Sequence, residues 1–244
     1  MISFVIPAHN EAAEMAGCLA AIHTAALAVA HPYEVIVVDD ASTDDTAAIA
    51  IGHHAEVVRV DHRQIAATRN AGAAAASGES LVFVDADTQI NETVLRKTLT
   101  ALTAGAVGGG ARIQLKGKLT YTQRLVMRIM MAIWRLTGWA AGCFIYCRRA
   151  DFEAVGGFDE RYYASEEIHL SRALMRRGKF KLLSTPVLTS ARKLHLYSHK
   201  EQWRTVRHLL VGGLPAARRR SGLEFWYDSR REPQKAASKS KAQS

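Results

Sequence analysis

The chain has 244 residues, of which 48% are hydrophobic, so it can bury one sizeable core with a small appendage. Its 32 basic and 23 acidic residues give a net charge of +9, and residues 230–241 alone contribute five basic side chains against one acid. The charge left on the body is too modest and scattered to indicate nucleic acid, but it suits an anionic ligand or a lipid surface. Three cysteines form no disulfide framework and exclude a disulfide-stapled secreted scaffold.

The first residues already predict a strand, at 2–6, and leave no room for a signal peptide. The longest charge-free apolar run near the middle, 129–134, is far shorter than the ~20 residues that span a bilayer. We therefore expect a cytoplasmic protein that at most contacts the inner face of the membrane.

Strand and helix patterns alternate over the first hundred residues. Ser42 is placed to cap one of the helices, with Asp45 three residues on as in a capping box. The rhythm predicts an α/β fold with a mostly parallel sheet and helices on both faces. The strands are expected at 2–6, 35–38, 55–60 and 81–84, and the helices at about 12–30, from Ser42 onward, at 65–76 and at 91–102.

Polar residues follow three of these strands. Asn10-Glu11 comes after the first strand, Asp39-Asp40 after the second and Asp85-Ala86-Asp87 after the fourth. Because parallel strands end at the same edge, these residues are expected to meet in the crevice where open α/β sheets bind ligands. An isolated Asp-x-Asp would more simply be a solvated loop, and the convergence of three loops is what favours a site.

Asp85 and Asp87 lie one residue apart, so in extended backbone both carboxylates point to the same side. A paired carboxylate suits a hard divalent cation that takes its remaining ligands from substrate phosphates. A dinucleotide site is excluded because no Gly-x-Gly-x-x-Gly follows the first strand. The glycines at 108–110 come too late for that role and predict a strand bend or a close approach.

Residues 119–139 predict a helix with Arg124, Arg128 and Arg135 on one face, and with Leu125, Ile129, Met130, Ile133 and Trp134 on the others. Such a helix can lie on an anionic membrane or cradle a lipid phosphate. Alternatively, it packs over the sheet with its arginines in solvent. The sequence leaves these two interpretations open.

The later segments are predicted from shorter signals. Cys143 and Cys147 fall in a strand and are interpreted as small apolar residues, because no further Cys or His group completes a zinc site. The glycines at 156–157 permit positive φ. Ser165 is placed to cap a helix that opens on two acids. The remaining predictions are a helix at 151–155, a helix at 200–214 and a basic, disordered tail at 216–244.

Together these segments resemble the family 2 glycosyltransferases, which have the GT-A fold. The resemblance covers residues 2 to about 195 and implies a GT-A domain at 1–215 with a helical C-terminal extension. Its nucleotide-sugar-binding half would be 1–105, and its acceptor and catalytic half 106–215. The motifs that carry the resemblance lie at 4–11, 37–44, 69–72, 83–87, 156–160, 166–172 and 189–192.

The resemblance implies a donor that is a UDP- or GDP-linked sugar. Asp85 and Asp87 would hold Mn²⁺ or Mg²⁺ against the diphosphate, with His195 as a third ligand. Gly157 would lie close to the sugar, and Arg192 belongs to a segment that looks like the closing segment of a soluble bacterial branch of the family. The other donor contacts would come from Pro7, Asn10, Glu11, Asp39 or Asp40, Arg69 and Ala86.

The resemblance also implies an inverting reaction in which a glutamate deprotonates the acceptor hydroxyl. Glu167 stands at the position of the base, and Glu166 is the alternative. The family usually has Glu-Asp with a second Asp two residues later, where this chain has Glu167 and His169. The acceptor would be a lipid-linked or small-molecule hydroxyl in cell-envelope polysaccharide or glycolipid synthesis.

Two other functions fit parts of the sequence. A nucleotidyltransferase would share the nucleotide-binding sheet but attack phosphorus, and would release or consume pyrophosphate. A sugar-nucleotide or lipid-head-group binding module with a degraded site would bind without turnover, and the departure at His169 is the best support for it.

Overall fold

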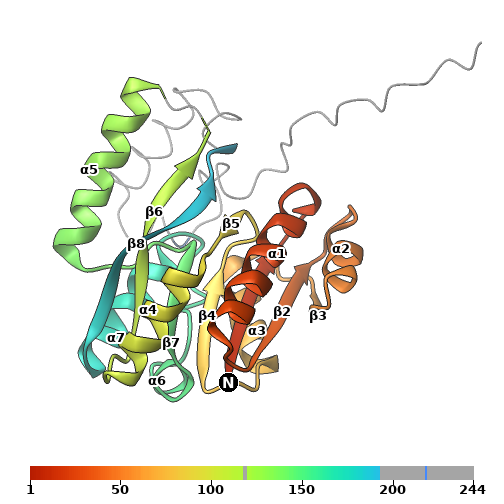
Figure 1. The fold of residues 1–244 in the computed structure, drawn as a ribbon, viewed down its shortest axis with the longest axis horizontal. Coiled ribbons are helices and arrows are strands. Elements are labelled where there is room, and N and C mark those ends of the chain that lie inside the picture. Colours follow the sequence, from red (N-terminus) through yellow and green to blue (C-terminus); the bar gives the residue numbers. More distant parts are fainter. Residues whose placement is uncertain (118–119, 193–217, 219–244) are drawn as a thin grey trace, which may run out of the picture. The chain divides into compact units, whose positions relative to one another are not determined.

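Eight strands form one sheet in the order β3-β2-β1-β4-β7-β6-β8-β5 (Figure 1). In this computed structural model, residues 1–117, 120–192 and 218 are described. Residues 1–191 make one compact unit and 192–244 a second. The predicted domain limit at 215, the helix at 200–214 and His195 therefore lie outside the described residues.

The first half of the chain has the predicted α/β alternation. β1 is parallel to β2 and β4, and β2 is parallel to β3, so the ends of these strands share one edge. The strands are β1 (Ile2–Ala8), β2 (Tyr33–Asp40), β3 (Glu56–Val60) and β4 (Ser80–Val84). The helices between and after them are α1 (Ala12–Val29), α2 (Thr46–Gly52), α3 (Ile65–Ala75) and α4 (Glu92–Thr103).

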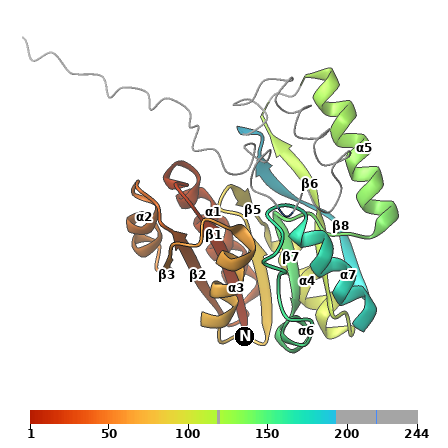
Figure 2. The ribbon, with the colours of Figure 1, turned by 180° about the vertical axis from the view of Figure 1, so that it is seen from behind.

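The strands β1, β2 and β4 are buried on both faces. Alternate strand residues belong to two core clusters, one containing Phe4 and Val82 and the other containing Val5 and Phe83. α1 and α4 pack on the first cluster, and α3 and α7 (Glu166–Arg177) on the second, as the two opposite views show (Figures 1 and 2). The continuous apolar run of β4 is thus explained by its two covered faces.

The second half of the sheet is mixed, with antiparallel pairing at β4–β7, β6–β7 and β5–β8 and parallel pairing at β6–β8. Four of the seven pairings are parallel. Three of these strands were not predicted, namely β5, β6 and β8. The elements of this half are β5 (Thr88–Gln89), β6 (Gly108–Lys116), α5 (Tyr121–Thr137), β7 (Phe144–Arg148), α6 (Arg149–Ala154) and β8 (Phe180–Ser190).

The glycines that open β6 confirm the predicted close approach. A Cβ on Gly109 would collide with the backbone carbonyl of Lys181 and the ring of Tyr146, whose hydroxyl donates to that same carbonyl at 2.6 Å. A Cβ on Gly110 would lie 2.6 Å from that of Ala140. Only glycine lets β6 sit between these two neighbours.

The two predicted serine caps are wrong as caps. α2 begins at Thr46, because Ala41 turns the chain at φ 52° and Asp44 then accepts the backbone N–H of Thr46 at 3.1 Å. Ser42 instead accepts the N–H of Asn10 at 2.8 Å. Ser165 does precede α7, but at φ 67° it forms no side-chain cap.

Helix α1 is long and apolar enough to cross a membrane by length and composition, with 33% of its residues buried. All six of its buried residues, among them Met15, Leu19 and Ile22, belong to the core cluster on the sheet. The contacts of α1 are therefore those of a core helix.

The buried thiols fit the apolar interpretation of the cysteines. Cys147 is fully buried in the second core cluster. Burial raises the pKa of the Cys18, Cys143 and Cys147 thiols, so they stay neutral at physiological pH.

Candidate active site

Arg69 lies at the centre of the site, on α3, with only 1% of its side chain exposed. Its Nη1 donates to Glu166 Oε1 at 2.7 Å, and its Nη2 donates to Asp85 Oδ1 at 2.8 Å. Nη2 also donates to the carbonyl of Gly142 at 2.9 Å. Burial opposes the charge of the guanidinium, but Asp85 and Glu166 outweigh it and raise the pKa of Arg69. One buried cation therefore joins the end of β4, the start of α7 and the turn before β7.

The two neighbouring glutamates of α7 have different surroundings. Glu166 is 5% exposed, and its carboxylate is paired with Arg69. Glu167 forms no ion pair among the described residues, and burial beside the negative charge of Glu166 raises its pKa to about 8. A Cβ on Gly142 would lie 3.7 Å from Glu167 Cδ and 3.4 Å from Arg69 Nη2, so the missing side chain leaves room for both. Glu167 thus sits at the site in its protonated form at neutral pH.

Asp85 and Asp87 lie at the carboxyl end of β4, as predicted. Asp85 keeps 29% of its side chain exposed while one oxygen bonds Arg69. Asp87 is held by β8, because Thr189 Oγ1 donates to Asp87 Oδ1 at 3.1 Å and the N–H of Ser190 donates to the Asp87 carbonyl at 3.2 Å. Thr189 and Ser190, the first two residues of the segment at 189–192, therefore hold the side chain and the main chain of Asp87.

The carboxylates fit a hydrated divalent cation by their donor chemistry. Within the part of the chain that the structure describes, no group of three His, Cys, Asp or Glu side chains could hold a metal. Mg²⁺ and similar ions are commonly held by one or two carboxylates, with waters and substrate phosphates completing the shell. Asp85 and Asp87 match that pattern, whereas a closed site made of protein ligands is not present in those residues.

Asp40 is used by the fold. Its Oδ1 accepts the N–H groups of His62 at 2.7 Å and Arg63 at 2.9 Å, and its Oδ2 accepts the hydroxyl of Thr68 at 2.8 Å. The N–H of Gln64 also donates to Oδ2, at 3.3 Å. Asp40 therefore fixes the loop that leads into α3 and carries Arg69 into the centre of the site.

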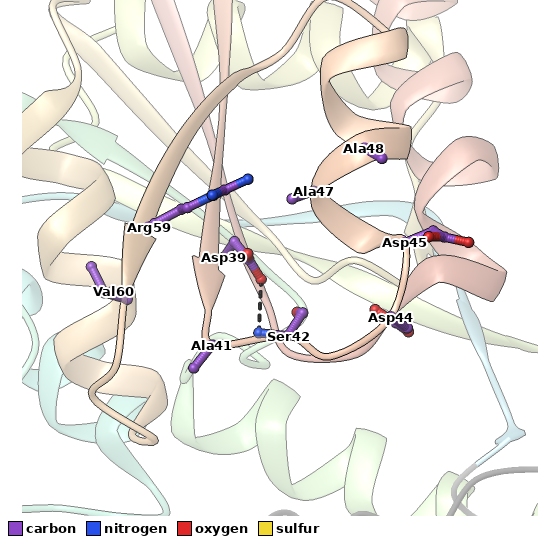
Figure 3. Close-up of a pocket in the computed structure, with 9 residues that line it drawn as sticks. All are labelled: Asp39, Ala41, Ser42, Asp44, Asp45, Ala47, Ala48, Arg59 and Val60. Carbon is purple, nitrogen blue, oxygen red and sulfur yellow. Dashed lines mark hydrogen bonds between the residues drawn. The ribbon is translucent and has the colours of Figure 1, made fainter.

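Asp39 faces a cavity of about 380 Å³ beside β2 and α2. Its Oδ1 accepts the N–H of Ser42 at 3.1 Å, and Arg59 lines the same cavity from β3 (Figure 3). Asp39 lies directly opposite Arg59 in the register of the two strands. Asp39 lines this cavity, and Asp40 is not among its lining residues.

The loop after β1 is held against the loop after β2. Asn10, at φ 59°, accepts the N–H of Thr43 through Oδ1 at 2.6 Å, and the N–H of Glu11 donates to Thr46 Oγ1 at 2.8 Å. Pro7 lies within β1 opposite Val38. The predicted nucleoside residues therefore share one edge of the sheet with Asp39.

The turn at Gly157 is held by Asn70 through the next residue, Phe158, and Asn70 is not among the predicted site residues. Asn70, next to Arg69 on α3, accepts the N–H of Phe158 and donates to its carbonyl, each at 2.9 Å. Gly157 has φ 72°, and a Cβ there would lie 2.8 Å from Asn70 Oδ1. The Arg69-Asn70 pair thus holds both α7 and the glycine turn. The only sequence signal for this role was the place of the two residues in the motif at 69–72.

Ala86 and Arg192 are the remaining predicted site residues. Ala86 is 3% exposed between the two aspartates. Arg192 is partly buried and begins the second unit of the chain.

Solved structures with the same fold are glycosyltransferases of the GT-A class. One is TarS 1-349 from S. aureus in complex with UDP-GlcNAc, at 19% identity and a TM-score of 0.61, covering 86% of this chain and 65% of that one. Another is the mannosyltransferase PcManGT from Pyrobaculum calidifontis in complex with GDP-Man and Mn²⁺, at 20% identity and a TM-score of 0.65, covering 86% and 61%. The chain thus spans just under two thirds of the TarS and PcManGT chains that it matches.

A third similar structure is glucosyl-3-phosphoglycerate synthase from Mycobacterium tuberculosis with Mn²⁺, UDP and glucosyl-3-phosphoglycerate, at 20% identity and a TM-score of 0.61, covering 89% of this chain and 80% of that one. No curated protein sequence matches the chain. The family model described as glycosyl transferase family 2 matches residues 3–181, and the chain belongs to that family.

Proposed function

We propose that this protein transfers a sugar from a nucleotide-diphosphate sugar to an acceptor hydroxyl, with inversion at the anomeric carbon and a divalent cation on the donor. The observation that carries the proposal is the Arg69 bridge, which joins the Asp85 carboxylate to the helix end that bears Glu167. A cation-binding carboxylate and a general base are thereby held on the two sides of one site. The fold is shared with enzymes solved with UDP-GlcNAc or GDP-Man, which supports a donor of that class.

In the proposed reaction Glu167 accepts the proton of the acceptor hydroxyl. The acceptor oxygen then forms a bond to the anomeric carbon while the bond from that carbon to the diphosphate oxygen breaks. The nucleoside diphosphate leaves with the electron pair, and no covalent enzyme intermediate is required. Mn²⁺ or Mg²⁺ held by Asp85 and Asp87 would neutralise charge on the departing diphosphate. Asp39 would bind the nucleobase in the cavity that it shares with Arg59.

The acceptor in this proposal is a lipid-linked or small-molecule hydroxyl, and the reaction takes place in the cytoplasm at the inner face of the membrane. Product analysis tests the reaction class. A sugar transferase releases nucleoside diphosphate, a nucleotidyltransferase releases pyrophosphate, and a binding module releases neither. Release of pyrophosphate, or binding of the donor without turnover on any acceptor, would rule the proposal out.

The cation site predicts that UDP or GDP stabilises the protein more with Mn²⁺ than with a chelator. Ligand binding to the native state adds roughly 2.7 kcal/mol when the ligand is at about a hundred times its dissociation constant. In Asp87→Ala most of the difference between Mn²⁺ and chelator should disappear from the thermal unfolding midpoint. Glu153→Ala removes an exposed acid on α6 and serves as the control. Equal stabilisation with Mn²⁺ and with chelator would contradict the cation site.

The two neighbouring acids of β2 should separate in their effects. Asp39→Asn should weaken nucleotide binding by about tenfold or more, because a charge-assisted hydrogen bond is worth roughly 1.5–3 kcal/mol. Asp40→Ala should instead lower the free energy of unfolding by about 2–4 kcal/mol, since it strips the partners of three backbone N–H groups and a hydroxyl. Calorimetric titration with nucleotide and urea unfolding measure the two effects. The base-binding role fails if Asp39→Asn binds as the unchanged protein does.

A further inference from the structure

The segment of the chain that contains α5 is basic and has no acidic side chain of its own. Residues 93–150 contain ten Lys and Arg and not one Asp or Glu. Near its two ends, Arg96 pairs with Glu92 and Arg149 pairs with Glu153, two acids that lie just outside the segment. α5 lies inside this segment and has basic residues without a single acidic one.

The described side chains of α5 place two of these cations on one exposed stripe. Every exposed residue described within the helix recurs at a spacing of three or four, which puts them on a single face. Tyr121 is 78% exposed and Leu136 is 87% exposed, the highest values among the exposed large hydrophobics of the described residues. The stripe comprises Tyr121, Arg124, Arg128, Ala132 and Leu136.

Helix α5 is capped at both ends and lies at the surface. Thr120 and Gln123 form a capping box at its start, and Gly138 ends it at φ 74°. It lies beside β6 and β8, on the far side of the molecule from α2 and β3 in both views (Figures 1 and 2). With 17 residues it extends about 25 Å, so the stripe is long enough to lie flat on a surface.

We propose that this stripe docks the protein on an anionic lipid bilayer. Arginines attract anionic head groups, while the exposed aromatic and aliphatic side chains enter the boundary between head groups and acyl chains. An exposed Leu136 has no comparable role on a phosphate backbone, so a bilayer explains the stripe better than nucleic acid does.

The membrane proposal is independent of the proposed chemistry, although the two fit together. α5 ends at Thr137, and five residues later Gly142 accepts the hydrogen bond from Arg69, so a bilayer under α5 lies close in sequence to the active site.

Vesicle sedimentation with the full chain tests the proposal. We expect binding to vesicles of phosphatidylcholine with phosphatidylglycerol, and much weaker binding to phosphatidylcholine alone. Arg124→Glu with Arg128→Glu should lower the partition by at least about tenfold, since each basic residue near an anionic surface contributes roughly fivefold. Tyr121→Ser with Leu136→Ser should lower it as well. Lys179→Glu with Lys181→Glu makes the same charge change at exposed positions where β8 begins, and should keep the binding.

The basic residues of the C-terminal tail are present in every variant, so the comparison isolates α5. An unchanged partition of either α5 variant, or an equal loss in the Lys179 and Lys181 control, would overturn the proposal. Binding to an oligonucleotide in place of the anionic vesicles at the same ionic strength would assign the stripe to nucleic acid and overturn it too. Nucleotide should raise the thermal unfolding midpoint of each variant by as much as that of the unchanged protein, whatever the result with vesicles. A failure at the membrane is thereby distinguished from a failure of the proposed transferase.

Discussion

Glu167→Gln should lower turnover by about 10²–10⁴-fold, the range that general-base catalysis supplies, and leave donor affinity close to that of the unchanged protein. Glutamine keeps the size of the side chain but cannot accept a proton. Steady-state kinetics together with calorimetric titration of the donor separate the two effects. Glu166→Gln is the neighbouring comparison: because Glu166 is paired with Arg69, its loss should appear chiefly in stability.

The pH dependence gives a second measurement of the same residue. A base must be deprotonated to work, and the pKa of Glu167 in the free protein is about 8. The value of kcat/KM should therefore rise with pH and level off above about pH 8, because this parameter reports the free enzyme. Glu167→Gln should lose that limb. A flat profile in the unchanged protein, near-full turnover of Glu167→Gln, or a product that keeps the donor's anomeric configuration would each contradict the inverting assignment.

Arg69→Met should lower the free energy of unfolding by about 3–5 kcal/mol, the usual cost of removing one partner from a buried ion pair. The replacement has a similar length, so the loss comes mainly from Glu166, which is left buried and unpaired, and from Asp85. Urea unfolding measures it. Arg96→Met is the matched control, because its pair with Glu92 is exposed and should contribute less than about 1 kcal/mol.

The Arg69 substitution also has a compensating partner. Adding Glu166→Gln to Arg69→Met removes the orphaned charge, so the double variant should be more stable than Arg69→Met alone. Additive losses would show that the pair is not coupled. If Arg69→Met and Arg96→Met lower the free energy of unfolding equally, the contacts of Arg69 do not stabilise the site as we infer.

Local sequence determined the first half of the fold and the edge where the site lies. Strands that are covered on both faces need continuous apolar runs, so β1, β2 and β4 could be predicted from the sequence. The polar residues that follow these strands indicated their common edge. The strands β6 and β8 were not predicted, because glycine and mixed composition obscure a strand whose partners come from distant parts of the chain. The caps at Ser42 and Ser165 failed for a related reason, since backbone turns at positive φ placed those hydroxyls elsewhere.

Only the tertiary structure decided which acid of each neighbouring pair is hydrogen-bonded by the fold. Asp39 and Asp40 are adjacent in sequence, as are Glu166 and Glu167. The sequence leaves two candidates in each pair, although the resemblance places Glu167 at the position of the base. In the folded chain Asp40 accepts the bonds that build the entry to α3, and Glu166 accepts the guanidinium of Arg69. Asp39 is left beside a cavity and Glu167 with a raised pKa. The physical reason is that a carboxylate's role depends on which donors come within about 3 Å of it, and those donors arrive from residues 20–100 positions away only when the chain is folded.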